Sequence, residues 1–322
     1  MEERTVWMIL GRPMTPYAVS IWIGCLLALA VFIAEGRRLK KSALVWTTAL
    51  GILLGLLGAR LFYVLARLEL FMDIGFENIF FVQDEGLKEW GAANGAAFWG
   101  AVGGVSLAGV LAAKISGERI SGILDALAPS AALGIAISRF GEYAIGEGIG
   151  PEAELESLRF FPIAVVNEWE EWNYALFMLE GLVGLIIFVL LLTAGRKYRD
   201  GYRARMFLIL YSSSQIVLEA LRRDNFLRWL FVRVSQVTAA AVLLVLIVFG
   251  VIRWLRKPKE TRMPAARVIV CCALFALAAG AVIALEFAID KSPTLTVGTA
   301  YLLETLCCVV FGVTSWQLAM KN

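Results

Sequence analysis

The chain has 322 residues, of which 60% are hydrophobic and 18% are charged. Soluble domains are about half apolar and about a quarter charged, so this composition excludes an ordinary soluble protein and indicates a membrane protein. The chain contains no histidine, which excludes His-ligated metal sites and Ser-His-Asp triads.

Nine apolar runs approach the roughly 20 residues that a helix needs to cross a bilayer. They lie at 17–34, 44–66, 94–114, 121–138, 174–194, 204–221, 232–254, 266–289 and 297–319. The fourth run is the least regular, because it is short and contains Asp125 and Pro129. The sequence therefore predicts an all-α, polytopic membrane protein with about nine transmembrane helices. Residues 1–16 lack the pattern of a cleavable signal peptide, so we expect the first span to act as the insertion signal.

The charges of the connecting segments predict the orientation, because Lys and Arg tend to stay on the cytoplasmic side. With the N-terminus outside, the cytoplasmic connections contain 18 of the 30 Lys and Arg, and the opposite connections contain 18 of the 27 Asp and Glu. We therefore expect an external N-terminus, a cytoplasmic C-terminus and an odd number of spans. The net charge of +3 reflects this topology and gives no indication of nucleic-acid binding.

Two long connections, 67–93 and 139–173, face outside on this topology. The first predicts a short interfacial helix, because it contains several aromatic residues among acids: Phe71, Phe76, Phe80, Phe81 and Trp90. A basic, proline-containing linker follows residue 255. We therefore divide the chain into a seven-span core at 1–255 and a linker with an additional two-span hairpin at 256–322.

Ionisable residues inside spans are candidates for function, because each is costly unless it is paired or hydrated. Arg60 lies deep in the second span, and Tyr63 follows it on the same helical face. The Arg60 guanidinium would suit a lipid phosphate or a structural ion pair with Glu180 or Glu219. Both interpretations are open.

The richest pattern follows the fourth span, where Arg139 precedes glycines at 141, 146, 148 and 150. Such glycines allow backbone N–H groups to turn toward an anion. An arginine beside them can hold a phosphate through two parallel hydrogen bonds. The alternative is a glycine-rich re-entrant loop in which Arg139 and Glu142 form a local pair. We favour the phosphate site.

Two further patterns concern helix faces. On the sixth span, a spacing of three and four places four polar residues on one face, which must point into the bundle or a hydrated cavity: Tyr211, Gln215, Glu219 and Arg222. A structural network and a substrate contact explain this face equally well. In the third span, small residues recur through 95–104 and predict close helix packing.

These clusters, in this order, resemble the prolipoprotein diacylglyceryl transferase family from about residue 15 to 255. The most specific match is Asp125 and Pro129 ahead of the Arg139-Phe-Gly-Glu stretch, which closes in Gly146-Glu147-Gly-Ile-Gly150. The other matches are Tyr17, Gly58-Ala-Arg60 with Tyr63, Leu179-Glu180-Gly181, and Glu219 with Arg222. The seven spans and the orientation of the family agree with the prediction made from charge.

The resemblance implies a bacterial cytoplasmic-membrane enzyme that needs no metal or other cofactor. It would move the diacylglyceryl group of phosphatidylglycerol onto the lipobox Cys thiol of a prolipoprotein, with release of glycerol phosphate. On this resemblance Arg139 and Tyr17 would be catalytic residues. We expect Glu142 to be the third, as a general base, because it lies one turn from Arg139. The lipid phosphate would lie against Arg139, Arg60, Gly141, Gly146, Glu147 and Gly150. The cavity would be supported by Trp99, Tyr63, Gln215, Glu219 and Arg222.

The chain departs from the family pattern at several positions. Trp99 replaces the family His, Glu142 replaces an Asn and Gln215 replaces an Arg. The segment 170–173 replaces a His-Pro-Ser-Gln stretch. Each lost charge-assisted contact would cost about 1.5–3 kcal/mol. The alternative to a transferase is therefore a catalytically degenerate relative that binds anionic phospholipid or a partner membrane segment. A transporter is a weaker interpretation, because the sequence shows no inverted repeat.

Overall fold

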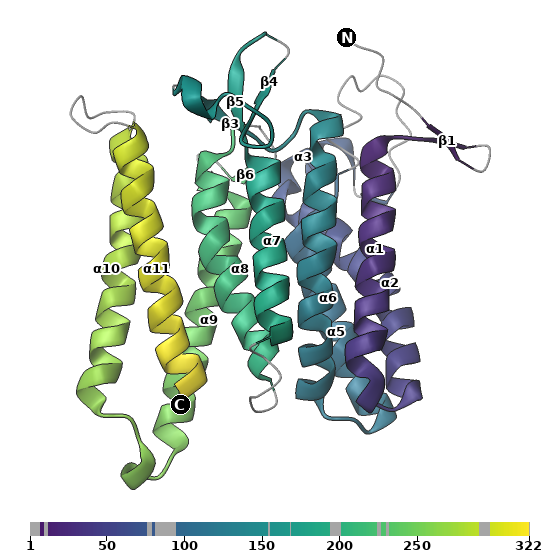
Figure 1. Ribbon diagram of the computed structural model, residues 1–322. Coiled ribbons are helices and arrows are strands. Elements are labelled where there is room, and N and C mark those ends of the chain that lie inside the picture. The colour runs from purple at the N-terminus through teal and green to yellow at the C-terminus, as the bar shows by residue number, and fades with distance from the viewer. Residues whose placement is uncertain are drawn as a thin grey trace.

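The computed structural model describes residues 7–9, 12–75, 79–80, 95–153, 155–167, 169–193, 201–223, 227–229, 232–289 and 297–321. Within this part of the chain, nine long helices lie side by side in one bundle (Figure 1). They are α1 Pro16–Glu35, α2 Lys41–Ala66, α5 Phe98–Ser116, α6 Ile120–Phe140, α7 Leu176–Thr193, α8 Tyr202–Leu221, α9 Val234–Arg256, α10 Ala265–Ile289 and α11 Val297–Lys321. The predicted all-helical class is confirmed, including a helix at the irregular fourth run.

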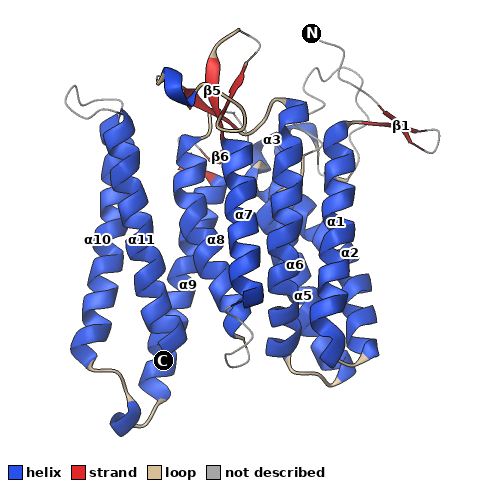
Figure 2. Ribbon diagram, in the orientation of Figure 1, coloured by secondary structure: helices blue, strands red, loops and turns tan. Residues whose placement is uncertain are grey.

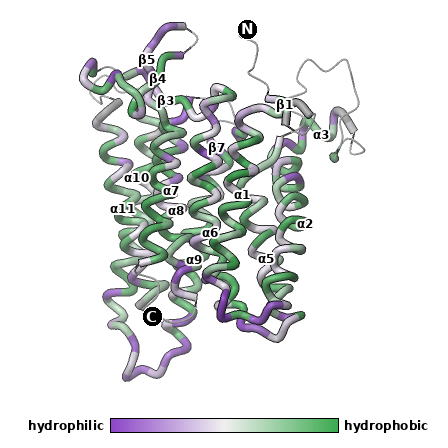
Figure 3. Tube along the Cα trace, turned by 45° about the vertical axis from the view of Figure 1, so that its right-hand side comes forward, coloured by the Kyte–Doolittle hydropathy of each residue, from purple (hydrophilic) through white to green (hydrophobic). Residues whose placement is uncertain are grey.

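Eight of these nine helices are long and apolar enough to cross a membrane. The exception is α8, whose buried residues include serines, a glutamine and a glutamate. Its neighbours α6, α7, α9 and α11 surround it, so its polar side chains are covered by protein. Figure 3 shows apolar residues along the helices and hydrophilic residues in the connections at both ends. The chain is a multi-pass membrane protein.

The two ends of the bundle differ, and we name them the sheet end and the linker end. At the sheet end, an antiparallel sheet has the order β3-β5-β4 (Figure 2), with β3 Ile149–Glu152, β4 Ala164–Val166 and β5 Trp172–Ala175. Two short hairpins pair β1 Trp7–Ile9 with β2 Arg12–Met14, and β6 Arg228–Trp229 with β7 Val232–Arg233. At the linker end lie the short helical turns Gly36–Arg38 and Lys259–Thr261. The sequence had predicted only an irregular connection where the three-stranded sheet forms.

The predicted interfacial helix is present in part, as α3 Leu68–Ile74. The prediction that Phe71 lies at the membrane interface is wrong, because its side chain is fully buried and packs in a cluster with Tyr63 and Val64. Phe76, Phe81 and Trp90 lie outside the described residues.

Small residues bring α2 and α5 into backbone contact. A Cβ atom on Gly100 would lie 2.1 Å from the carbonyl oxygen of Gly58, and one on Gly104 would lie 1.9 Å from that of Leu54. No side chain fits at either position, so the predicted close packing of the third span is confirmed. This contact fixes the start of α5, where Trp99 lies.

The last two helices, α10 and α11, form a hairpin that packs on the rest of the bundle through α11. A Cβ atom on Gly250 of α9 would lie 2.7 Å from the backbone of Leu318. Phe311 and Cys308 belong to the same hydrophobic cluster as Phe207 of α8. The division of the chain at residue 255 stays a prediction.

Candidate functional site

The guanidinium of Arg139 lies between two carboxylates near the sheet end of α6. It pairs with Glu142 one turn further along the chain, and its Nε atom lies 2.7 Å from Oε2 of Glu180 on α7. The local Arg139–Glu142 pair that the sequence allowed is therefore formed. Only 13% of the Arg139 side chain is exposed.

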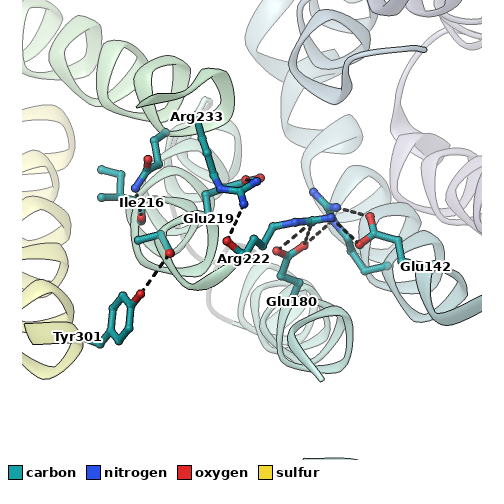
Figure 4. A network of polar contacts seen from close by, with 10 residues as sticks. Glu142, Glu180, Ile216, Glu219, Arg222, Arg233 and Tyr301 are labelled. Atoms are coloured by element: carbon teal, nitrogen blue, oxygen red, sulfur yellow. Dashed lines mark hydrogen bonds and ion pairs between the residues drawn. The ribbon is translucent and has the colours of Figure 1, made fainter. Parts of the chain in front are cut away.

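Arg222, directly after α8, binds the same two carboxylates from the other side (Figure 4). Its Nη2 atom lies 3.2 Å from Oε2 of Glu142, and its Nη1 atom lies 3.3 Å from Oε1 of Glu180. Arg233 donates a hydrogen bond to the carbonyl of Arg222 and lies 3.9 Å from Oε2 of Glu219. We call these six residues the arginine–glutamate network: Arg139, Glu142, Glu180, Glu219, Arg222 and Arg233.

The network combines three arginines and three glutamates, so it is electroneutral when all six groups are ionised. Taking these charges out of water is costly, and their mutual pairing offsets the cost. Burial lowers the pKa of Arg222, but the carboxylates of Glu180 and Glu142 raise it more strongly, and the pKa lies above its usual value. Arg222 is therefore a permanent cation that holds α8 to α6 and α7.

The glycine-rich stretch after Arg139 folds as a tight turn. Residues Gly141–Ile145 form a 3₁₀ helix, which ends at Gly146 with a φ of +70°. The amide of Gly146 donates to the carbonyl of Tyr143, and the amide of Glu147 donates to that of Glu142. These two amides close the turn, in contrast to the prediction that they would point at an anion.

Two glycines instead allow other groups to approach the network closely. A Cβ atom on Gly141 would lie 1.8 Å from Oγ of Ser20 on α1. A Cβ atom on Gly148, whose φ is +69°, would lie 2.8 Å from Oε2 of Glu142. Gly150 lies in β3, where a Cβ atom would lie 3.0 Å from the side chain of Leu176. The glycines thus pack α1, β3 and α7 around the carboxylate of Glu142.

Tyr17 lies beside the network. Its hydroxyl is close enough to Glu142, Glu147, Arg139 and Arg222 to interact electrostatically with all four. Its role in headgroup binding stays a prediction. The side chain comes from the first turn of α1.

Arg60 lies apart from the network. Its Nη1 atom donates to the carbonyl of Gly95 at 2.8 Å, and its Nε atom donates to the carbonyl of Ile79. Its guanidinium also lies over the rings of Tyr63 and Phe71, at 5.7 and 5.3 Å from their centres. Arg60 therefore ties the end of α2 to the segments on either side of residues 81–94.

The possible ion pair of Arg60 with Glu180 or Glu219 is wrong. In the described part of the chain, Glu180 pairs with Arg139 and Arg222, and Glu219 lies near Arg233. Helical spacing shows which face carries a residue, but it does not show which helices adjoin that face.

Aromatic rings fill the space next to Arg139. The ring centres of Trp99 and Tyr211 are 5.7 Å apart, and those of Phe98 and Tyr211 are 5.4 Å apart. The hydroxyl of Tyr211 lies beside the Arg139 guanidinium. Among the described residues, the buried Nε1 of Trp99 has no hydrogen-bond partner. Gln215, one turn after Tyr211, is 2% exposed.

A pocket of about 300 Å³ lies at the sheet end among apolar side chains. Its lining residues are Phe140, Tyr143, Phe161, Phe177 and Met178. Phe140 directly follows Arg139, and Tyr143 directly follows Glu142. The pocket therefore has an apolar lining, and two of its lining residues directly follow charged residues of the network in the chain.

Sequence reasoning missed two members of the network. Glu180 occurs in the family match and as a possible partner of Arg60, but the sequence did not place it in the site. The signal for Glu180 was a carboxylate inside an apolar span, which requires a buried cation. Arg233 gave a weaker signal, because it is the second residue of the apolar run 232–254, where a charged side chain can still reach the surface.

Comparison with known proteins identifies the family. The model of the prolipoprotein diacylglyceryl transferase family matches residues 4–254. The chain belongs to this family. A phosphatidylglycerol–prolipoprotein diacylglyceryl transferase of Parasynechococcus marenigrum is 28% identical over 268 residues, which cover 76% of this chain and 92% of that protein. The enzyme of the same name from Listeria monocytogenes is 29% identical over 268 residues, with coverages of 76% and 91%. That from Shouchella clausii is 28% identical over 266 residues, with coverages of 78% and 90%.

Proposed function

We propose that the chain is a phospholipid-dependent transferase that moves the diacylglyceryl group of phosphatidylglycerol onto the lipobox Cys thiol of a prolipoprotein. The thiol sulfur would form a bond to the carbon of the diacylglyceryl group that carries the phosphate. The bond between this carbon and the phosphate oxygen would break. Glycerol phosphate would leave with the bonding electron pair. Membership of the transferase family and the names of the relatives support this reaction.

The observation that carries the proposal is the position of Arg139. Its guanidinium lies at one end of the bundle and retains some exposure at 13%, and in this proposal a phosphate would replace one of its two carboxylate partners. Charge on the leaving phosphate would then be stabilised by a preorganised cation in a site of low polarity. Arg222 would hold the displaced carboxylate, because it already contacts both.

Tyr17 and Glu142 have the remaining catalytic roles in this proposal. The hydroxyl of Tyr17, next to Arg139 and Glu142, would bind the headgroup. Phosphate binding to Arg139 would release the carboxylate of Glu142, and this carboxylate would then accept the thiol proton. Arg60 would have a minor role in headgroup binding, because it lies apart from the network and its Nε and Nη1 atoms donate to the backbone.

The apolar pocket at the sheet end supports the same location for the reaction. Its aromatic lining, with Phe161 64% exposed and Tyr143 56% exposed, suits an acyl chain or the apolar part of a signal segment. We propose that the sheet end faces outside in the bacterial cytoplasmic membrane and that α11 ends in the cytoplasm. The excess of basic residues at the linker end supports this orientation.

The test is a transfer assay with purified protein, phosphatidylglycerol and a lipobox peptide. Thioether-linked lipid and free glycerol phosphate are the expected products. Arg139→Gln should abolish both products, whereas the matched change Arg159→Gln should retain them, because Arg159 lies in the connection between β3 and β4, with 32% of its side chain exposed and 3.8 Å from Glu152. Equal transfer by both variants would refute the role of Arg139.

A second candidate function is lipid binding without catalysis. The observation that favours it is the electroneutral network, in which Arg139 already has two carboxylate partners. A binding protein would release no glycerol phosphate, yet it would retain phosphatidylglycerol through purification, and Arg139→Gln would lose it. The same assay therefore separates the two candidates.

A further inference from the structure

The helix α8 carries two different stripes of residues. Glu219, in line with Arg222, belongs to the stripe that reaches the arginine–glutamate network. Residues Ser213, Val217 and Ala220 are spaced by four and three and form a second stripe. With 3.6 residues per turn, the second stripe lies on roughly the opposite face of the helix.

The second stripe contacts α11, which runs antiparallel to α8. At the sheet end, the hydroxyl of Tyr301 donates to the carbonyl of Ala220 at 3.4 Å (Figure 4). Further along, a Cβ atom on Gly312 would lie 3.5 Å from Oγ of Ser213. From the sheet end to the linker end, the contacting residues have decreasing numbers in α8 and increasing numbers in α11. The contacts therefore define one antiparallel register between the two helices.

Two more contacts follow the same register. The thiol of Cys308 contacts the backbone of Val217, between the two pairs above. At the linker end, the rings of Tyr202 and Trp316 lie 5.7 Å apart in an edge-to-face arrangement. Together these contacts extend along the length of α8.

The match to the family model ends at residue 254, so α11 lies outside the part of the chain that defines the family. We propose that α11 is a positioning element of the candidate site. Because α11 packs on the face of α8 opposite to the network, it fixes the rotation of α8 about its axis and its position along that axis. These two quantities determine where Arg222 contacts Glu142 and Glu180. This inference rests on the proposed function only for its lipid-binding readout.

The first test compares two glycine substitutions in the hairpin. A Cβ atom on Gly312 would already be in van der Waals contact with Ser213, so we expect the larger side chain of Gly312→Leu to overpack this contact and displace α11 relative to α8. The matched control is Gly280→Leu in α10, where a Cβ atom has nothing within 4 Å. Binding of fluorescent phosphatidylglycerol in nanodiscs of neutral lipid should weaken about tenfold for Gly312→Leu, the loss of one charge-assisted contact, and should be unchanged for Gly280→Leu.

The dissociation constant per binding site distinguishes a displaced Arg222 from a general structural defect of the variant. A structural defect would lower the fraction of molecules that bind and leave the dissociation constant of the rest unchanged. A displaced Arg222 would raise the dissociation constant at unchanged stoichiometry. If Gly312→Leu changes only the stoichiometry, or changes nothing, α11 does not position the site.

The second test needs no lipid, so it decides the inference even if the unaltered protein fails to bind phosphatidylglycerol. Gly312→Leu alters α11 where it packs against one face of α8, and Arg222→Gln alters the arginine–glutamate network on the opposite side of α8. Independent effects of the two changes would add. We expect the drop in unfolding temperature caused by Gly312→Leu to be smaller in the Arg222→Gln background. Additive shifts would overturn the proposal. If Gly312→Leu does not fold, Tyr301→Phe replaces it in both tests, with an expected two- to threefold loss of affinity because one neutral hydrogen bond is removed.

Discussion

Arg222 and Glu180 lie 42 positions apart in the chain, yet Nη1 of Arg222 lies 3.3 Å from Oε1 of Glu180. The contact joins the end of α8 to the first half of α7, and both side chains are almost completely buried at 3% and 1% exposure. Each of the two charges therefore depends on the other for stabilisation. Arg139 shares the same carboxylate, so the pair links the candidate site to the packing of three helices.

The first prediction concerns this pair. Arg222→Gln or Glu180→Gln alone should lower the free energy of unfolding by about 3–5 kcal/mol, because each leaves the buried network of three arginines and three glutamates with one uncompensated charge. The double variant should lose less than the sum of the two losses. Urea unfolding in detergent, followed by tryptophan fluorescence, measures all three values. The control is the change Glu152→Gln, which breaks the 3.8 Å pair of Glu152 with the partly exposed Arg159 and leaves the hydrogen bond from Arg159 to the carbonyl of Ala153 in place; it should cost less than about 1 kcal/mol.

The second prediction compares two glycines with the same backbone conformation. Gly146 and Gly148 have φ values of +70° and +69°, but only at Gly148 would a Cβ atom meet neighbours, namely Oε2 of Glu142 and Cβ of Phe177, both at 2.8 Å. Gly146→Ala should cost about 1–2 kcal/mol of unfolding free energy, for the backbone alone. Gly148→Ala should cost about 1–3 kcal/mol more because of overpacking. It should also weaken lipid binding, because Glu142 must move. Equal losses at the two positions would contradict this packing around Glu142.

Much of the fold was predictable because it depends on local sequence. Apolar runs of about membrane length predicted all nine long helices. The spacing of Arg139 and Glu142 allowed their local pair, although the sequence favoured a phosphate site at this position. The small residues around Gly100 gave the close contact with α2. These signals depend on residues that are near one another in the chain or on a single helix face.

The assembly of the site was less predictable, because it depends on which helices adjoin. From the sequence, several arginines were possible ion-pair partners of Glu180. Only the packing of α6, α7 and α8 shows that its partners are Arg139 and Arg222. The three-stranded sheet at the sheet end was missed because its strands are three or four residues long and carry no extended apolar alternation. The full-length contact between α8 and α11 gave no sequence signal beyond small residues such as Gly312.

The third prediction concerns the indole of Trp99, which occupies the position of the family His. Its Nε1 atom is buried and has no hydrogen-bond partner in the described part of the chain, which costs about 1–3 kcal/mol. Trp99→Phe removes this unpaired donor but also some packing volume, so the free energy of unfolding should change by less than about 1 kcal/mol. Trp99→Ala should cost about 3–5 kcal/mol. If Trp99→Phe is as damaging as Trp99→Ala, the indole N–H has a partner in the folded protein.

The last prediction separates the two arginines that were assigned to the lipid phosphate. Arg139 lies in the network, whereas Arg60 donates to the carbonyls of Gly95 and Ile79. Arg60→Gln removes charge-assisted hydrogen bonds to neutral acceptors, so it should lower the free energy of unfolding by about 1.5–3 kcal/mol. It should weaken the binding of phosphatidylglycerol less than Arg139→Gln does, because the hydrogen bonds of Arg60 are already directed at the backbone.

Stability and binding must be measured on the same preparations to make that comparison. Unfolding in detergent gives the structural cost of each variant, and the dissociation constant per folded molecule gives its effect on the site. Arg159→Gln again serves as the control for the loss of an arginine at the sheet end. A loss of affinity for Arg60→Gln that equals or exceeds the loss for Arg139→Gln would show that the phosphate lies at the end of α2, and the centre of the site would move from the network to Arg60.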